Sequence, residues 1–135
     1  MEKKRQHSRQ AGFTLIEIIA VLVILGILAA VAVPRFVNLQ KEARIKAAQG
    51  LVASAQSALS MKYSEALLQN NGDVNATWNT LTTAPNPQSI CDNNVQRDGY
   101  NGYTLTCSAN NNVINIVVTT PDNEDVNGTF TNPGQ

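Results

Sequence analysis

The residues able to do chemistry are few in this sequence, and they lie far apart. Its 135 residues include one histidine, His7, and two cysteines, Cys91 and Cys107. A single histidine near the N-terminus argues against histidine-based catalysis and against a zinc site, and no Cys-x-x-Cys-His haem motif occurs. Glycine-rich phosphate-binding motifs and the Gly-x-Ser-x-Gly nucleophile motif are also missing. We therefore predict that the protein is not an enzyme and that it has no cofactor and no bound metal.

The two cysteines form an isolated pair in the C-terminal half of the chain. In a small exported domain, such a pair is typical of a disulfide rather than of a metal site. A disulfide between Cys91 and Cys107 closes a loop of about 17 residues, which stabilises a fold by roughly 3 kcal/mol in the chain-entropy model. The alternative is two buried free thiols, and it gains weight only if this part of the chain is cytoplasmic.

Glu17 has the most unusual surroundings of any charged residue. Except for Thr14, all other residues in the segment 13–33 are apolar, alanine or glycine. As a helix this segment is about 31 Å long, which matches the hydrocarbon core of a bilayer. A charge inside such a segment is costly and usually functional. The segment is too long for a secretory signal peptide, and residues 34–36 lead into more helical sequence without a cleavage site.

Charge is unevenly distributed, although the net charge is zero. Residues 1–12 carry a net charge of +3, residues 35–62 carry +4 and residues 63–135 carry −6. The basic N-terminal segment predicts that residues 1–12 lie in the cytoplasm and that the chain beyond Pro34 lies across the membrane. Because the charges are segregated in this way and form no dedicated basic face, we assign no nucleic-acid binding.

Helical periodicity continues beyond the apolar segment and predicts one helix over residues 13–70. Pro34 removes one helical N–H and, together with Gly26, makes residues 26–34 the stretch where we expect the helix to loosen. The Asn-Asn-Gly sequence at residues 70–72 is a strong signal for the end of this helix. Apolar residues at helical spacing predict a face that packs on a head. They are Ile45, Ala48, Val52, Ala55, Leu59 and Ala66.

Residues 71–135 are rich in Asn, Thr, Ser, Gly and Pro and predict a small β-rich head. Apolar patterns predict strands over residues 103–107, 113–119 and 126–131, with a polar hairpin loop over residues 108–112. Residues 77–90 predict a loop with at most a short helical turn around Trp78. The expected fold class is therefore α+β, with one long N-terminal helix, half of it transmembrane, packed on a small antiparallel sheet. The expected segments are a basic leader (1–12), a transmembrane half-helix (13–34), an amphipathic half-helix (35–70) and the head (71–135).

Two weaker patterns occur in the head. Asp122, Glu124 and Asp125 offer oxygen ligands suited to calcium, but they lack EF-hand spacing, and we interpret them as a solvated acidic loop. Asn75 and Asn127 begin glycosylation sequons, a short pattern that is expected by chance in a sequence rich in Asn and Thr. We assign no function to either pattern.

The sequence Gly-Phe-Thr-Leu-Ile-Glu at residues 12–17 follows a basic leader and begins an unbroken apolar helix. In this arrangement it resembles the class III signal of type IV pilins and of type II secretion pseudopilins. The resemblance is close over residues 12–63 and implies the pilin fold. Residues 34–44 resemble in particular the mannose-sensitive haemagglutinin branch of the type IVa-like pilins. The head contains no motif that identifies a subfamily.

The resemblance also implies how the chain is processed and assembled. A prepilin peptidase would cleave between Gly12 and Phe13 and would N-methylate the new Phe13 amine. Glu17 matches the fifth-position glutamate of the family, and in a filament it would pair with the Phe13 amine of a neighbouring subunit. The alternative is that Glu17 reaches the membrane surface beside the amine of its own chain. Subunits would leave the inner membrane through the pilus assembly machinery and form a helical homo-oligomer.

Three functions remain open at this point. The leading one is a major pilin, located in the bacterial inner membrane with its N-terminus inside and later in an extracellular pilus for adhesion, motility or DNA uptake. The second is a type II secretion pseudopilin. The resemblance implies that the head of a major pseudopilin usually has a calcium loop and no disulfide, so Cys91, Cys107 and the unconvincing calcium loop disfavour this function. The third is a membrane-anchored enzyme or sensor, which is disfavoured because the head has no histidine and no recognisable nucleophile–base set.

Overall fold

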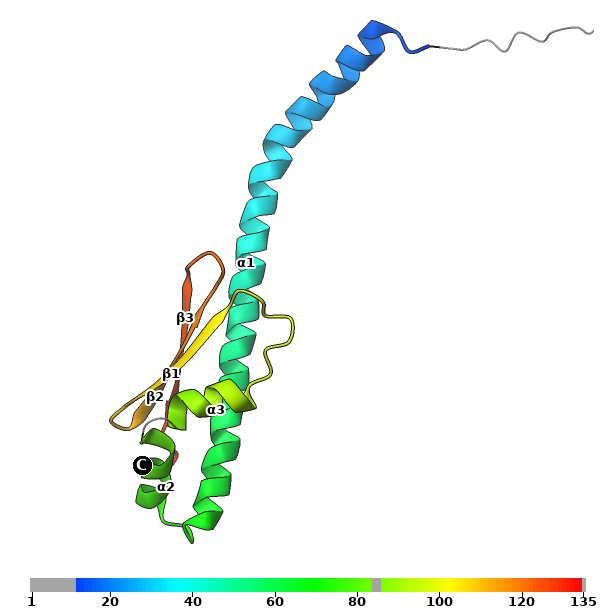
Figure 1. Cartoon of the computed structure of the whole chain (residues 1–135). Helices are drawn as coiled ribbons and strands as arrows, with labels where there is room; N and C mark the ends of the chain where they lie inside the picture. The colour runs from blue at the N-terminus through cyan, green and yellow to red at the C-terminus, as the bar shows by residue number, and fades with distance from the viewer. Residues whose placement is uncertain (1–11, 84–85, 135) are drawn as a thin grey trace, which may run out of the picture. The chain divides into compact units, whose positions relative to one another are not determined.

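The computed structural model describes residues 12–83 and 86–134 (Figure 1). Most of the predicted leader, residues 1–11, lies outside the described residues. The chain divides into two compact units, residues 1–39 and residues 40–135. Within the described residues, three helices precede three strands, and this gives the α+β class that the sequence predicts.

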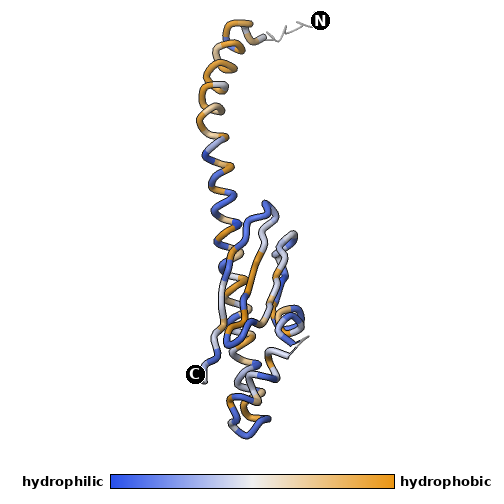
Figure 2. Tube along the Cα trace, turned by 90° about the vertical axis from the view of Figure 1, so that its left-hand side faces the viewer, coloured by the Kyte–Doolittle hydropathy of each residue, from blue (hydrophilic) through white to orange (hydrophobic). Residues whose placement is uncertain are grey.

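Helix α1, Leu15–Gln69, is 55 residues long and continues without interruption through Pro34. The predicted helix over residues 13–70 is confirmed, except that Phe13 and Thr14 precede its first residue and Asn70 follows its last. The N-terminal part of α1 is long and apolar enough to cross a membrane. Figure 2 shows the change in hydropathy along α1, from mostly hydrophobic residues near its start to a hydrophilic stretch beyond them.

Helix α1 ends in a left-handed turn. Asn71 and Gly72 have φ angles of 52° and 84°, a conformation that asparagine and glycine adopt more easily than other residues. The N–H of Gly72 donates to the carbonyl of Leu67 at 2.9 Å, which satisfies one of the last helical carbonyls. The predicted stop signal is thus confirmed.

Helix α2, Val74–Thr82, occupies part of the segment that the sequence predicts to be a loop. Asp73 is its N-cap, and the Asp73 carboxylate accepts a hydrogen bond from the N–H of Ala76 at 3.0 Å. Its apolar residues Trp78 and Leu81 are buried in the core. The loop prediction was wrong here because a good N-cap and tertiary burial outweigh the low helix propensity of a Thr- and Asn-rich segment.

Helix α3, Asn86–Asn94, follows α2 and also contradicts the predicted loop. Pro87 lies in its first turn, where the missing N–H removes no helical hydrogen bond. The predicted disulfide is present in the structure and joins Cys91 of α3 to Cys107, with the two Cα atoms 6.3 Å apart. This covalent link fixes α3 against the neighbouring strand.

The strands β1 (Thr104–Asn110), β2 (Val113–Thr119) and β3 (Asp125–Thr131) form an antiparallel sheet in the order β1-β2-β3. The three predicted strands are confirmed, but the first hairpin is tighter than predicted. Asn110 pairs with Val113, so the loop contains Asn111 and Asn112 alone rather than residues 108–112. Asn111 has a φ of 52°, as two-residue hairpin loops commonly require.

The core of residues 40–135 lies between α1 and the sheet. Ile114, Ile116 and Val118 alternate along β2 and are fully buried on its inner face. The predicted apolar face of α1 packs against them, although Ile45 at its start is only half-buried. The buried residues of α1 are Ala48, Leu51, Val52, Ala55, Ala58, Leu59, Tyr63 and Ala66.

Strand β3 approaches α1 very closely at Gly128. A β-carbon added to Gly128 would lie 2.2 Å from Cγ1 of Val52, a separation that real β-carbons essentially never show. The strand can lie this near to the helix only because residue 128 has no side chain. Gly128 therefore sets the distance between helix and sheet.

Glutamine side chains cover part of each edge of the sheet. At the β1 edge, the side-chain amide of Gln88 accepts the N–H of Cys107 at 2.8 Å and donates to the carbonyl of Leu105 at 3.2 Å. At the β3 edge, the amide of Gln56 donates to the carbonyl of Thr129 at 3.0 Å. These amides take the place of a further strand and thereby reduce the tendency of open edges to pair with other chains.

Candidate processing and assembly site

The residues around the predicted cleavage point precede the first turn of α1. Gly12, Phe13 and Thr14 are exposed and lie outside any helix or strand. The exposed fraction of Phe13 is 85%. A β-carbon at Gly12 would meet no atom within 4 Å, so the packing of the described residues does not require a glycine there. The peptide bond between Gly12 and Phe13 is thus in a segment that another protein can reach.

Thr14 and Glu17 form a reciprocal cap at the start of α1. The backbone N–H and the hydroxyl of Thr14 both donate to Oε2 of Glu17, each at 2.7 Å. In return, the N–H of Glu17 lies 3.4 Å from the Thr14 hydroxyl oxygen, which accepts it. This is the arrangement known as a capping box, which satisfies N–H groups that have no partner within the helix.

The capping box was missed in the sequence analysis, which considered Glu17 only as a charge. The signal was available, because Thr14 and Glu17 have the Thr-x-x-Glu spacing and directly precede an apolar run. The structure shows that Glu17 has a local role in addition to any role between subunits. Thr14 is therefore a further candidate residue of this site.

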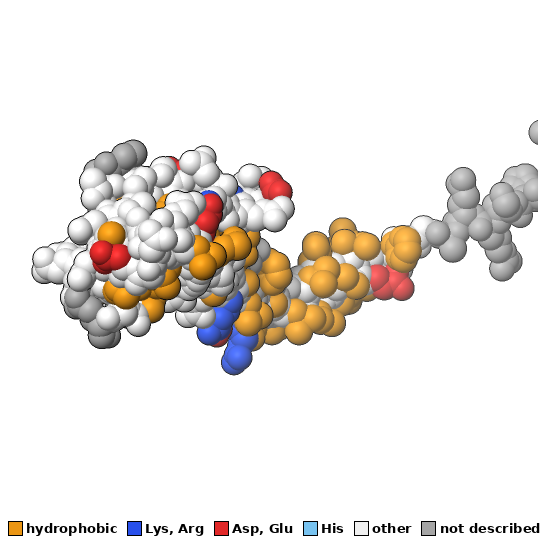
Figure 3. Space-filling view, turned by 90° about the horizontal axis from the view of Figure 1, so that it is seen from below, with side chains coloured by type: hydrophobic (Ala, Val, Ile, Leu, Met, Phe, Trp, Pro, Cys, Tyr) orange, Lys and Arg blue, Asp and Glu red, His pale blue; other side chains and the backbone are white. Residues whose placement is uncertain are grey.

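The surface that follows the cap is apolar on all sides. Figure 3 shows hydrophobic side chains exposed along the N-terminal part of the chain. The larger ones between Leu15 and Val33 have exposed fractions from 48% to 77%. Glu17 is the one charged residue of the segment 13–33. A helix that is hydrophobic all round needs a membrane or other apolar partners around it.

Gly26 and Pro34 both lie inside the continuous part of α1. A β-carbon at Gly26 would meet no atom within 4 Å, and Pro34 leaves the carbonyl of Ala30 without its usual helical donor. The loosening predicted for residues 26–34 concerns a change of environment during assembly. It stays a prediction.

Residues 7–33 match the family model described as the prokaryotic N-terminal methylation motif. The chain is 38% identical to the type II secretion system core protein G of Aeromonas hydrophila over 93 residues, which are 64% of this chain and 62% of that protein. It is 46% identical to the protein of the same name from Pseudomonas aeruginosa over 56 residues, 42% of this chain and 39% of that one. It is also 45% identical to the type IV narrow pilus major component PilA5 of Thermus thermophilus over 64 residues, 47% of this chain and 52% of that protein.

The matched motif contains the whole segment from Gly12 to Val33, including the capping box. The chain thus carries the N-terminal segment of the type IV pilin family. Both pilins and secretion core proteins occur among its relatives. The chain spans 39 to 62% of the length of those three relatives. No solved structure matches the chain.

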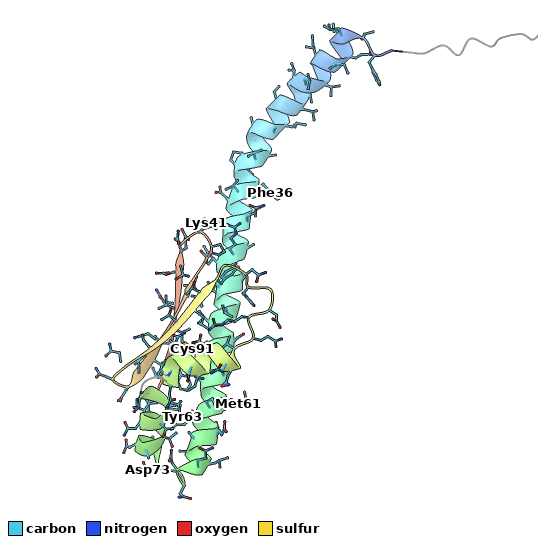
Figure 4. All side chains as sticks on the ribbon, in the orientation of Figure 1. Phe36, Lys41, Met61, Tyr63, Asp73 and Cys91 are labelled. Atoms are coloured by element: carbon cyan, nitrogen blue, oxygen red, sulfur yellow. A yellow bond between two sulfur atoms is a disulfide. The ribbon has the colours of Figure 1, made fainter. Side chains whose placement is uncertain are left out.

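The acidic loop after β2 contacts cations of α1. Nζ of Lys41 lies 2.5 Å from Oε1 of Glu124, and Arg44 pairs with Asp122. Asp125 accepts a hydrogen bond from the hydroxyl of Thr119 at 2.6 Å. Each of the three carboxylates considered for calcium thus has a partner within the chain. Figure 4 shows Lys41 near this loop.

The two cations are shifted toward their charged forms. The hydrogen bond and the charge of Glu124 raise the pKa of Lys41, and those of Asp122 raise the pKa of Arg44. A raised pKa means that the stability linked to each cation's shift is present at neutral pH and is lost as alkaline pH removes the proton. Both pairs are solvent-exposed, so their individual contributions to stability are small.

Proposed function

We propose that the chain is the major structural subunit of a type IV pilus. The observation that carries this proposal is the segment that starts at Gly12. An accessible Gly12–Phe13 bond is followed by a capped carboxylate, and then by a helix that is apolar on all sides. A soluble monomer cannot keep such a surface in water. A membrane before assembly and a helical filament core after it both provide the apolar surroundings that the helix needs.

Processing at Gly12 and Phe13 is the first step of the proposed function. A prepilin peptidase would cleave the bond between them and N-methylate the Phe13 amine. Neither residue is held by the fold, and Gly12 has no packing reason to be a glycine. This supports the proposal that residue 12 is small because a peptidase must accommodate it.

Glu17 is the proposed assembly residue. Cleavage creates a positive amine at Phe13, while the N–H and the hydroxyl of Thr14 remain available to Glu17. In a dry filament core, a carboxylate without a positive partner is strongly destabilising. We therefore place the Phe13 amine of a neighbouring subunit at the Glu17 carboxylate, where the pair would set the axial position of one subunit relative to the next.

The proposed location follows from the same segment. Before assembly, residues 13–34 span the bacterial inner membrane with the N-terminus in the cytoplasm, and residues 35–135 lie on the outer side. The inner-membrane assembly machinery then extracts the subunit into an extracellular filament, with residues 35–70 and the head on its outside. The Cys91–Cys107 disulfide supports this topology, because disulfides persist in oxidising compartments.

A type II secretion pseudopilin is the second candidate function. The alignment with the secretion core protein of A. hydrophila favours it, because it covers 64% of this chain, which is more than residues 1–69 make up, and therefore includes part of the head. The disulfide and the acidic loop favour the pilus, since the carboxylates of this loop are occupied by Lys41 and Arg44 rather than free for calcium.

Electron microscopy and mass spectrometry of surface fibres test the proposal together. Cells that express the chain should release sheared fibres whose subunit begins at methylated Phe13. Intact Met1 in isolated filaments, or an N-terminus created by cleavage after Ala30 or Ala32, would contradict it. If no fibre forms and deletion of the chain stops secretion of folded proteins, the pseudopilin function is correct instead.

A further inference from the structure

We propose that Asn101 is a site of spontaneous covalent modification, at which the asparagine cyclises with Gly102 and is converted to aspartate and isoaspartate. The sequence contains three Asn-Gly pairs, at residues 71–72, 101–102 and 127–128. Asparagine is a thermolabile residue, and a following glycine favours its loss, because no β-carbon shields the backbone nitrogen that attacks it. The proposal goes beyond the proposed function, since it holds for a pilus subunit and for a secretion pseudopilin alike.

The reaction needs water and no enzyme, oxidant or reductant. The backbone nitrogen of Gly102 attacks Cγ of Asn101, the bond from Cγ to Nδ2 breaks, and ammonia leaves with the proton of the Gly102 N–H. Water then opens the cyclic succinimide. Attack at Cγ restores the normal backbone and gives aspartate, whereas attack at the backbone carbonyl carbon gives isoaspartate. The net change replaces the side-chain amide by a carboxylate.

The attacking nitrogen at Gly102 has no hydrogen-bond partner among the described residues. Residues 100–103 form a turn that is closed by a hydrogen bond from the N–H of Tyr103 to the carbonyl of Tyr100 at 3.1 Å. Gly102 occupies the third position of this turn with a φ of 84°, as in a type II turn, where the N–H of the third residue stays unbonded. Asn101 and Gly102 are both exposed, so water reaches the pair.

Ring closure requires a rotation about ψ of Asn101. The β-carbon of the asparagine and the nitrogen of the next residue must come to the same side of the Cα–C bond, and the extended ψ of a type II turn keeps them apart. In this loop the rotation requires the loss of a single turn hydrogen bond, that of Tyr103. Openings of this size are among the least costly in a folded protein.

The pair Asn71-Gly72 is protected by the end of α1. The N–H of Gly72 donates to the carbonyl of Leu67 at 2.9 Å, so the attacking nitrogen is already engaged. Asn71 has a φ of 52°, in the left-handed region. The ψ of that region holds the β-carbon and the next nitrogen on nearly opposite sides of the Cα–C bond. Reaction here requires the last turn of the helix to unwind.

The pair Asn127-Gly128 is protected by the sheet. Both residues lie within β3, where Asn127 pairs with Val117 and Gly128 pairs with Ile116 of β2. Gly128 also packs directly on Val52 of α1. A rotation about ψ of Asn127 would therefore detach β3 from both neighbours. Of the three pairs, the fold leaves Asn101-Gly102 the easiest to rotate.

Modification of Asn101 would alter the contact between this loop and α1. Isoaspartate adds a carbon atom to the main chain between Tyr100 and Tyr103, whose rings are in edge contact with their centroids 5.7 Å apart. The hydroxyl of Tyr103 donates to the carbonyl of Arg44 at 3.3 Å. Figure 1 shows the loop between α3 and β1 beside α1. Both products also add a negative charge to a head that is already acidic.

The test is peptide mapping by mass spectrometry of the full chain, dispersed in detergent and aged in neutral buffer under native conditions. We expect conversion at Asn101 to be at least about tenfold faster than at Asn71 and at Asn127, because those two pairs need larger openings. Fragmentation assigns each conversion to a residue. The products at residue 101 should include both aspartate and isoaspartate, which shows that the reaction passes through the succinimide.

Two controls separate the fold from the sequence. The same chain, reduced and unfolded in denaturant, should lose the preference for Asn101, since all three pairs are then free to rotate. The variant Asn101→Gln keeps an amide but must form a larger ring, so it should stay unmodified at residue 101 and unfold at the same temperature. No conversion at Asn101, equal conversion of all three pairs in the folded chain, or an unchanged preference in denaturant would each overturn the proposal. Since the assay uses dispersed subunits, a failure to form fibres does not affect its outcome.

Discussion

The hydroxyl and the backbone N–H of Thr14 both donate to the same oxygen of Glu17, each at 2.7 Å. The carboxylate that the proposed function assigns to contacts between subunits is therefore already engaged within its own chain. Two roles, helix capping and charge pairing, thus belong to one side chain. Substitutions that separate them are possible because a glutamine can cap a helix but carries no charge.

Glu17→Gln should keep the helix start and lose the filament. We expect normal cleavage and methylation at Phe13, because the capping hydrogen bonds remain possible, but few or no fibres, because the charge is absent. Mass spectrometry of the N-terminus and electron microscopy of sheared material provide the two measurements. Glu17→Ala should fail in the same way, whereas normal fibres from Glu17→Gln would show that capping alone explains the residue.

Thr14→Val should loosen the first turn of α1. The hydroxyl that accepts the N–H of Glu17 is lost, so hydrogen exchange at the N–H groups of Glu17 and Ile18 should become several-fold faster in the full chain. Thr14→Ser is the matched control and should retain the wild-type exchange rates, since serine caps as well as threonine. Equal protection in all three chains would argue that the capping box does not stabilise the helix start.

Gly12→Leu should block processing without changing the fold. Nothing in the described structure packs against residue 12, so circular dichroism and thermal unfolding should be unaffected. Mass spectrometry should instead find the leader still attached, and fibres should be absent. Gly12→Ala, a much smaller change, should be processed at least in part, and equal processing of both variants would contradict the assignment of Gly12.

Removal of the disulfide should destabilise the head strongly. Cys91→Ser combined with Cys107→Ser opens a link that spans a sequence separation of 16 residues. The free energy of unfolding should fall by roughly 3 kcal/mol, measured by denaturant titration of the full chain and followed by Trp78 fluorescence. The unmodified chain under reducing conditions should show a similar decrease, and an unchanged unfolding midpoint in both experiments would contradict this prediction.

Gly128→Ala should push β3 away from α1. The added β-carbon would overlap Cγ1 of Val52, and we expect a loss of about 1–3 kcal/mol in the free energy of unfolding. Adding Val52→Ala should recover part of that loss, so the two effects should not be additive. Gly50→Ala is the control, because it places a methyl group in a helix at ordinary contact distance and should stabilise the chain slightly. Additive effects of the Gly128 and Val52 changes would argue against direct contact.

The long helix, the cysteine pair and the strands could be predicted because each depends on a local pattern. Residues 15–33 are apolar, alanine or glycine except for Glu17, and the alternation of Ile114, Ile116 and Val118 fixes the inner face of β2. The capping box was equally local and could have been found from the spacing of Thr14 and Glu17. Patterns of this kind need no information from distant residues.

Helices α2 and α3 could not be predicted because their stability comes from residues far away in the sequence. Trp78 packs on Phe130, and Cys91 is linked to Cys107, while the segments themselves are rich in residues of low helix propensity. The hollow lined by residues of α1, α2 and α3 could not be predicted from the sequence for the same reason, since it exists only when all three helices are in place. The hydrogen bonds of Gln88 at the β1 edge likewise depend on α3, a helix that the local sequence pattern does not predict.

The Thr14–Glu17 cap has a consequence for the reversibility of assembly. A carboxylate that already holds two donors does not enter the filament as an unsatisfied group, and a neighbour's amine exchanges partners with it rather than supplying the first one. In the proposed filament the amine would supply the positive partner that the two neutral donors of Thr14 cannot, so the charge pair would still be needed in a dry core. A subunit that returned to the membrane would lose this partner and keep its own cap, so the start of α1 would already be formed for a further round of assembly.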